Sequence, residues 1–355
     1  MKRYGNIYKK VVSDNNIRMA FIESINNSKK KNRKDIQYKL NNMDYYMRML
    51  QNNFHISGKY TTKIMSDRNT GKVRELLVPR YFPDQIIHHA LTRQTLPYIN
   101  KKIMRECCCS IKGRGTLYGS MLVRKALKNK GVKYYAQFDI KKYFPNVNQD
   151  ILAKQLENIF KDKQIIDLYK EIIYSVPNGI PLGNYTSQSL SNLYLTPLDR
   201  YIKQTLRIKY YVRYADDFVI IGKNKRELNR AIPLIASFLK NELKLEIHEN
   251  VKVYSIYDRP IDFCGYKHYK EFTTIRKRNW KKVRRMLLRK TNLTRAKRLM
   301  AYLGYILHSN SYNIMQRFIK KINNAKIIIS KRENNYAIWK INLYEWYKAN
   351  KWISR

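Results

Sequence analysis

The sequence predicts a mixed α/β chain of the α+β kind, with alternating strands and helices between two helical parts. Short runs of β-branched and aromatic residues alternate with longer helical patterns from about residue 71 to 271. The parts before and after, residues 1–70 and 272–355, are polar or basic with helical spacing. Because no repeat or Gly/Ser-rich linker separates the three parts, we expect them to fold together.

Residues 1–70 are expected to form an N-terminal helical extension. Apolar side chains recur at helical spacing within Ile17–Ile25 and again within Ile36–Leu50. The basic run Lys29–Lys34 separates these two stretches, so we predict a break between helices there.

Two adjacent carboxylates, Asp216 and Asp217, lie within the apolar stretch Tyr210–Gly222. The flanking β-branched and aromatic residues predict two short strands joined by a tight turn, with both acids at the tip. Asp is common in turns, so a solvated hairpin is one interpretation. Two like charges repel each other at a turn, however, and a bound divalent cation would relieve that repulsion.

A third carboxylate, Asp139, ends another apolar strand that begins near Tyr134. One interpretation is that Lys141 or Lys142 pairs with Asp139. The other is that this strand lies beside the Asp216–Asp217 hairpin and that the acids share metal ions. Mg²⁺ prefers oxygen ligands, and two such ions can clamp the attacking and leaving oxygens of a phosphoryl displacement.

These segments resemble the reverse transcriptases, most closely those of diversity-generating retroelements, a bacterial group similar to retron and group II intron enzymes. The matching segments occur in the order of the family: Arg74–Pro79, Asp84–Leu91, Ile111–Thr116, Phe138–Phe144, Asn178–Leu195, Tyr214–Asp217 and Ile261–Tyr266. The last of them resembles the strand that closes the palm. The resemblance implies a right-hand polymerase, with fingers and an antiparallel palm sheet in residues 71–271 and a helical thumb in residues 272–355.

The resemblance also implies an RNA-directed DNA polymerase in which Asp139, Asp216 and Asp217 are catalytic and hold two Mg²⁺ ions. Six residues are expected to contact the incoming dNTP or the template path: Lys72, Arg74, Phe144, Leu182, Gly183 and Gln188. Lys72 and Arg74 would approach the triphosphate, although a salt bridge in the fingers is the alternative. Phe144 matches the ring that excludes a 2′-hydroxyl, although it could instead be a core aromatic.

Leu182 stands where most reverse transcriptases carry glutamine, and the pattern from Leu182 to Gln188 is similar to that of the diversity-generating group. Leucine can neither donate nor accept a hydrogen bond near the nucleotide. We therefore expect a low-fidelity enzyme that misincorporates at template adenines, unless Leu182 merely packs.

The charge predicts a polyanionic partner, because 72 Lys and Arg residues against 26 Asp and Glu give a net charge of +46. From Arg276 to Arg298, twelve of 23 residues are basic and none is acidic. This stretch resembles the thumb that grips the primer–template duplex. Its expected nucleic-acid contacts are Arg276, Lys277, Arg278, Lys281, Lys282, Arg284 and Arg285.

The cysteines and the hydropathy predict a cytoplasmic protein that does not enter a membrane. Cys107, Cys108, Cys109 and Cys264 lack the paired spacing of a zinc site and suit a reducing compartment. No apolar run approaches the roughly 18 residues of a spanning helix.

The resemblance further implies template RNA, primer or cDNA, dNTPs and an oligomeric basic accessory variability protein as partners. A retron-like or defence-associated reverse transcriptase is one alternative. A catalytically silent RNA-binding scaffold is another, against which the intact Asp139, Asp216 and Asp217 argue.

Overall fold

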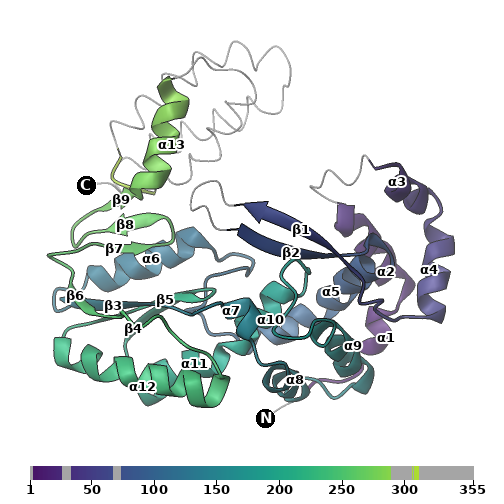
Figure 1. Ribbon diagram of the computed structural model, residues 1–355, viewed down its shortest axis with the longest axis horizontal. Helices are drawn as coiled ribbons and strands as arrows, with labels where there is room; N and C mark the ends of the chain where they lie inside the picture. The colour runs from purple at the N-terminus through teal and green to yellow at the C-terminus, as the bar shows by residue number, and fades with distance from the viewer. Residues whose placement is uncertain (1–2, 26–32, 67–72, 289–305, 307, 312–355) are drawn as a thin grey trace. The chain divides into compact units, whose positions relative to one another are not determined.

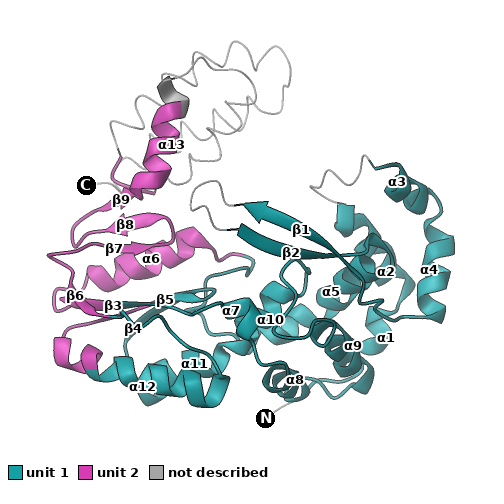
Figure 2. Ribbon diagram, viewed as in Figure 1, with its two compact units in different colours: residues 1–112, 137–218, 230–251 teal, residues 113–136, 219–229, 252–355 magenta. Residues whose placement is uncertain are grey.

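The computed structural model describes residues 3–25, 33–66, 73–288, 306 and 308–311 (Figure 1). Figure 2 divides the chain into two compact units, each discontinuous in sequence. The first unit comprises residues 1–112, 137–218 and 230–251, and the second comprises residues 113–136, 219–229 and 252–355. The functional boundaries near residues 70 and 271 stay predictions.

The described residues between 8 and 52 of the first unit are largely helical, as the sequence predicts. The expectation that the helical extension reaches residue 70 is wrong in its last part, because Tyr60–Ser66 forms a strand. The expected helix at Ile17–Ile25 is α2 (Asp14–Ile25), which follows the single turn α1 (Tyr8–Val11). The stretch Ile36–Leu50 forms two helices, α3 (Lys34–Asn41) and α4 (Met43–Asn52), which meet at Asn42. The interruption at Asn42 was not predicted from the apolar spacing.

In the first unit, α5 (Ile86–Asn100) packs against α2 and α10 (Ser187–Tyr194). The helix α9 (Lys163–Ile173) shows why these segments are helical, since Ile165, Leu168, Tyr169 and Ile172 recur on one face and are buried. The unit also contains η2 (Tyr81–Gln85), α7 (Tyr143–Asn146), α8 (Gln149–Glu157), α11 (Thr196–Arg200) and η3 (Tyr201–Thr205).

The described strands form three sheets (Figure 1). The two-stranded sheet pairs β1 (Tyr60–Ser66) with β2 (Val73–Pro79) in antiparallel register, with Tyr60 opposite Pro79. The four-stranded sheet has the order β4-β5-β3-β6. Its members are β3 (Tyr134–Asp139), β4 (Tyr210–Tyr214), β5 (Asp217–Gly222) and β6 (Val253–Ser255). Strands β3 and β5 run through the division between the units, and α12 (Lys225–Leu243) also crosses it.

The second unit contains α6 (Thr116–Leu127), α13 (Lys277–Leu288) and a three-stranded antiparallel sheet. The sheet has the order β7-β8-β9, formed by β7 (Ile261–Phe263), β8 (Tyr266–His268) and β9 (Thr273–Ile275). Lys270 caps the C-terminal end of α6, because its ammonium donates to the carbonyl oxygens of Leu127, Asn129 and Val132.

The segment Ile261–Tyr266 differs from the expectation of a single strand that closes the palm sheet. It forms a hairpin, in which Cys264 and Gly265 both adopt positive φ angles, of 52° and 86°. Two successive residues of this kind suit a tight two-residue turn between antiparallel strands. The strand that pairs with β3 at the edge of the four-stranded sheet is instead β6, with Tyr135 opposite Tyr254.

Candidate active site

The Asp216–Asp217 pair lies at the tip of the β4–β5 hairpin, as the sequence predicts. Strand β4 ends at Tyr214 and β5 begins at Asp217, so Ala215 and Asp216 form the turn. Val212, Phe218 and Val219 are buried and fix the hairpin to the core. Ala215 has a φ of 57°, a left-handed conformation that costs a residue with a Cβ about 1–2 kcal/mol. The surrounding structure must therefore hold this turn in place.

Strand β3 lies beside β5, and their side chains show which way the acids face. The rings of Phe138 and Phe218 are buried and stacked, with centroids 4.6 Å apart. Asp139 follows Phe138 and Asp217 precedes Phe218, and successive side chains of a strand point to opposite faces. Asp139 and Asp217 therefore share the face opposite the stacked rings.

A direct contact supports this arrangement. Gln137, two residues before Asp139 on β3, donates from Nε2 to Oδ1 of Asp217 at 3.0 Å. Residues two apart on a strand face the same way and are separated by about 7 Å. Asp139 is thus on the same face as the contact between Gln137 and Asp217.

Asp139 pairs with a histidine rather than with Lys141. Its side chain is 56% exposed, and its Oδ2 lies 3.6 Å from Nε2 of His248, whose backbone N–H donates to the Asp139 carbonyl oxygen. The ammonium of Lys141 lies instead 3.0 Å from Glu249 and 3.5 Å from Glu246. The sequence interpretation in which Lys141 neutralises Asp139 is therefore wrong.

The Tyr143 hydroxyl is buried in the first unit. Burial raises the pKa of Tyr143 well above its usual value, and the carboxylate of Asp216 contributes to this rise. Tyr143 begins α7, four residues after Asp139.

The three acids offer only carboxylate oxygens, a donor set that fits Mg²⁺. Among the residues that the structure describes, no three Asp, Glu, His or Cys side chains are grouped as a ready-made metal cage. Mg²⁺ sites commonly use only one or two carboxylates, with water and substrate phosphates as the remaining ligands. The donor chemistry thus fits the metal that the resemblance implies, without a preformed cage of protein ligands.

Leu182 and Gly183 lie against β2. The backbone N–H of Leu77 donates to the Leu182 carbonyl oxygen at 2.7 Å. Gly183 has a φ of 130°, and a Cβ at this position would lie 2.6 Å from the Leu77 carbonyl oxygen. The glycine is therefore required by the close approach of β2. Its expected contact with a nucleotide stays a prediction.

The other residues expected at the nucleotide lie in different surroundings. Gln188 is exposed and accepts a hydrogen bond from the Ser110 hydroxyl at 2.8 Å. Phe144 is half-buried on α7, with its ring edge-on to that of Tyr143. Arg74 is exposed on β2, opposite Met65, and Lys72 lies outside the described residues.

The basic residues of α13 are largely exposed. Val283 is buried, while Lys277, Arg278, Lys281, Arg284 and Arg285 are exposed and Lys282 is half-buried. Arg276 differs, since its Nε donates to Asp262 at 2.5 Å and its guanidinium is already paired within the second unit. The rest of the expected thumb, from residue 289 on, lies outside the described residues apart from 306 and 308–311.

Sequence reasoning missed Gln137, Tyr143 and His248 in this part of the first unit. Gln137 could have been found, because it lies two residues before Asp139 on a strand that was predicted correctly. No local signal marks His248, which contacts Asp139 from more than a hundred residues away in the chain. All these residues and the three acids belong to the first unit.

Two further features concern the cysteines and the helices of the described chain. The four cysteines are free, and Cys107, Cys108 and Cys264 are buried. Among the described helices, none combines the length and the apolar character needed to cross a bilayer.

Comparison with solved structures identifies the fold as that of right-hand polymerases. Apo telomerase from Candida tropicalis superposes with a TM-score of 0.55 at 15% identity, covering 86% of this chain and 66% of that chain. Telomerase from Candida albicans, solved with a fragment of telomeric RNA, gives a TM-score of 0.54 at 12% identity, covering 81% and 58%.

The sequence comparison then gives the family. The model described as "Reverse transcriptase (RNA-dependent DNA polymerase)" matches residues 78–268, which is more than half of the chain. The chain belongs to the reverse transcriptase family.

Two curated relatives are similar over part of their length. The group II intron-encoded protein LtrA of Lactococcus lactis is 21% identical over 276 residues, covering 57% of this chain and 45% of that protein. The retron Ec73 reverse transcriptase of Escherichia coli is 26% identical over 137 residues, covering 35% and 43%. The matches thus cover less than half of either relative.

Proposed function

We propose that this chain is an RNA-directed DNA polymerase, which extends a primer along an RNA template with dNTPs. Membership of the reverse transcriptase family supports the class of reaction. The main support from the structure is that Asp139 and Asp217, from strands far apart in the sequence, face the same way beside the Asp216 turn. Acids at the ends of adjacent strands are suited to phosphoryl transfer, in which positioning and charge stabilisation supply most of the catalysis.

Asp139, Asp216 and Asp217 are the proposed metal ligands, in the first unit. Two bound Mg²⁺ ions would supply Lewis-acid activation of the primer 3′-hydroxyl and charge neutralisation at the triphosphate. The protein itself orients the acids. The amide of Gln137 fixes one oxygen of Asp217, and the backbone contact of His248 fixes the end of β3 at Asp139.

Selection of the nucleotide is proposed for the residues around this face. Phe144 would lie under the sugar and exclude a 2′-hydroxyl. Arg74, and Lys72 beyond the described residues, would approach the triphosphate, for which the forked guanidinium of arginine is the better match. Gly183, Leu182 and Gln188 would line the path of the base and the template.

The basic thumb is proposed to track the backbone of the primer–template duplex. The exposed Lys277, Arg278, Lys281, Arg284 and Arg285 of α13, with the half-buried Lys282, have the chemistry of phosphate contacts. Arg276 is a weaker candidate because its guanidinium already forms an ion pair with Asp262.

Within the family, we infer a mutagenic enzyme of a diversity-generating retroelement. The support is Leu182 in place of glutamine and the pattern that runs from it to Gln188. On this proposal the enzyme works in the cytoplasm with an oligomeric basic accessory protein and makes cDNA altered at adenines. A retron-like enzyme is the second candidate, favoured by the similarity to the Ec73 protein.

Primer extension on an RNA template tests the proposal. We expect Mg²⁺-dependent DNA synthesis by the unaltered chain and a loss of at least about a thousandfold in Asp216→Asn, since an amide cannot replace the anionic ligand. Asp258→Asn, at an exposed site on the second unit, is the matched control and should retain activity. A parent chain that binds RNA but makes no DNA with any primer would instead support the scaffold interpretation.

A further inference from the structure

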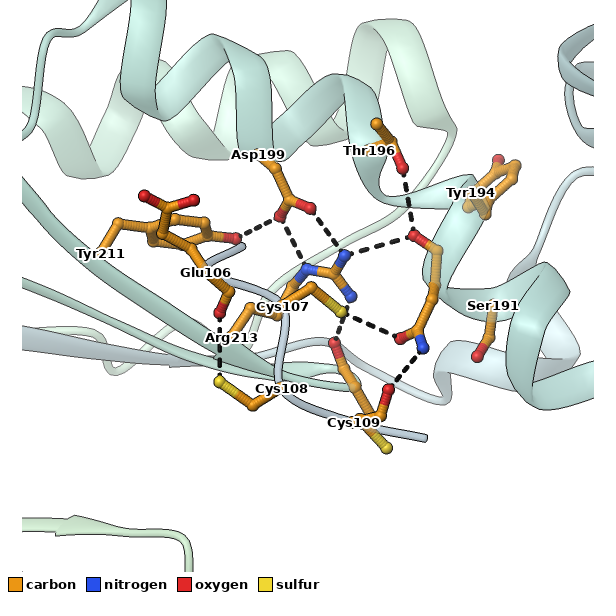
Figure 3. Close-up of polar contacts among 12 residues, drawn as sticks. Glu106, Cys107, Cys108, Cys109, Ser191, Tyr194, Thr196, Asp199, Tyr211 and Arg213 are labelled. Atoms are coloured by element: carbon orange, nitrogen blue, oxygen red, sulfur yellow. Dashed lines mark hydrogen bonds and ion pairs between the residues drawn. The ribbon is translucent and has the colours of Figure 1, made fainter. Parts of the chain in front are cut away.

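Arg213 and Asp199 form a buried ion pair (Figure 3). Arg213 is on β4, two residues before Ala215, and Asp199 is on α11. Both side chains are 0% exposed. The Nε and Nη2 atoms of Arg213 each donate to a different oxygen of Asp199 at 2.7 Å, a bidentate geometry.

Further contacts complete this cluster. Nη2 of Arg213 also donates to the Asn192 carbonyl oxygen at 3.2 Å. The Tyr211 hydroxyl donates to Asp199 at 2.7 Å (Figure 3). The backbone N–H of Arg213 donates to the Glu106 carbonyl oxygen, and the backbone N–H of Cys108 donates to the Arg213 carbonyl oxygen. Burial opposes the charge of Arg213, but the neighbouring Asp199 raises the pKa of the guanidinium well above its usual value. Arg213 is therefore a fixed cation in the core.

One donor of this fixed cation is aimed at the turn. Nη1 of Arg213 donates to the carbonyl oxygen of Ala215 at 3.1 Å. Ala215 is the residue in the left-handed conformation, and the next two residues are Asp216 and Asp217. The bond thus links a peptide in a left-handed conformation, next to the acids, to a buried guanidinium that Asp199 and Asn192 also hold.

A buried ion pair is by itself weak evidence that the fold needs it for stability. Apolar residues of similar volume commonly replace a buried ion pair with no loss of stability. An apolar cluster could not, however, offer a hydrogen-bond donor to the Ala215 carbonyl oxygen. What this cluster provides, and an apolar cluster would not, is the hydrogen bond from Arg213 to the Ala215 carbonyl oxygen.

We propose that Arg213, held by Asp199, is a positioning residue that keeps the Asp216–Asp217 turn in its metal-binding conformation and so sets its affinity for divalent cations. This inference rests on the proposed function of these acids as metal ligands. Residues that orient metal ligands from behind commonly change metal affinity by about 10–100-fold when they are replaced.

The first test is Arg213→Lys, which keeps the charge but cannot hold Asp199 with two parallel donors while also reaching Ala215. Binding of Mn²⁺ is measured by electron paramagnetic resonance of the free ion. The sample contains full-length protein, RNA template, a 3′-deoxy-terminated primer and dNTP, so no reaction occurs. We expect Mn²⁺ binding at least about tenfold weaker than in the parent, and primer extension that recovers as Mg²⁺ is raised.

Tyr211→Phe is the matched control, because it removes a hydrogen bond to the same Asp199 oxygen that accepts from Arg213 Nε but leaves the bond to Ala215. It should bind Mn²⁺ as the parent does, even if its thermal unfolding midpoint falls. Equal Mn²⁺ affinity in Arg213→Lys and the parent would overturn the inference.

A second variant separates positioning from folding. Replacing the cluster with apolar residues, as Arg213→Met with Asp199→Leu and Tyr211→Phe, should preserve the unfolding midpoint and still weaken Mn²⁺ binding. A stable triple variant with normal Mn²⁺ binding would show that the ion pair is only structural. If neither variant folds, the cluster is needed for folding, and the proposed positioning role is rejected.

The outcome for the inference can be separated from that for the proposed function. A parent chain that binds Mn²⁺ at Asp216 but makes no DNA contradicts the polymerase proposal and leaves the role of Arg213 measurable. A parent that makes DNA, with variants that bind Mn²⁺ normally, contradicts only the inference.

Discussion

The contact between Gly179 and the residue proposed to select dNTPs gives a prediction that the structure makes quantitative. Gly179 has a φ of 69°, and a Cβ there would lie 2.2 Å from the carbonyl oxygen of Phe144 and 2.7 Å from the backbone of Pro145. The neighbouring Ile180 N–H donates to the same Phe144 oxygen at 3.0 Å. Any side chain at position 179 must therefore push away the backbone that positions the Phe144 ring.

Gly58 provides a matched control. It has a similar φ of 64°, but its Cβ would meet only Ser175, at an ordinary contact distance of 3.8 Å. Both Gly→Ala variants lose the ease with which glycine adopts this conformation, which costs about 1–2 kcal/mol. Gly179→Ala adds overpacking against backbone atoms, worth about 1–3 kcal/mol more.

Urea unfolding and nucleotide competition together test this reasoning. We expect Gly179→Ala to lower the free energy of unfolding by about 2–5 kcal/mol, against about 1–2 kcal/mol for Gly58→Ala. We also expect only Gly179→Ala to incorporate rNTPs more readily relative to dNTPs, because only this change displaces Phe144. Equal destabilisation by the two variants, or unaltered discrimination in a folded Gly179→Ala protein, would refute it.

Three further predictions follow from the proposed roles. Phe144→Ala should raise the ratio of rNTP to dNTP incorporation by at least about tenfold in single-nucleotide extension, since the ring no longer crowds a 2′-hydroxyl; continued rejection of rNTPs would contradict this role. Leu182→Gln should reduce misincorporation opposite template adenine, counted by sequencing the cDNA, and an unchanged error spectrum would mean that Leu182 merely packs. Replacing Lys281 and Arg284 with Gln should reduce the slope of log affinity against log salt by about two for a primer–template duplex. The double variant Lys225→Gln with Arg226→Gln on α12 loses the same charge and should change this slope less. Equal slopes in the two double variants would argue against a specific role for α13.

The parts of the site that the sequence predicts are those marked by local patterns. Alternation of apolar residues places Asp139 at the end of a strand and Asp216 in a turn, and the structure confirms both. A strand's two faces are encoded in its own residues, so the direction of Asp139 follows once Phe138 is known to be buried.

The contacts that the sequence does not predict depend on which distant segments meet. The chain gives no sign that Arg213 would be buried on Asp199, since a basic residue in a strand ordinarily suggests an exposed face. The local pattern of Ile261–Tyr266 also resembled one strand, because the left-handed turn at Cys264 involves a residue that rarely adopts this conformation. Gly183 was predicted to approach a nucleotide, whereas the approach that the structure describes is to Leu77.

The joint binding of metal by the acids of β3 and the β4–β5 turn is tested most directly by anomalous X-ray scattering from Mn²⁺. The crystals would contain the chain with RNA template, a terminated primer and dNTP. We predict Mn²⁺ at about 2.1–2.2 Å from carboxylate oxygens of both Asp139 and Asp216, close to the distance usual for Mg²⁺. Metal bound elsewhere, or by only one of these two segments, would contradict the account.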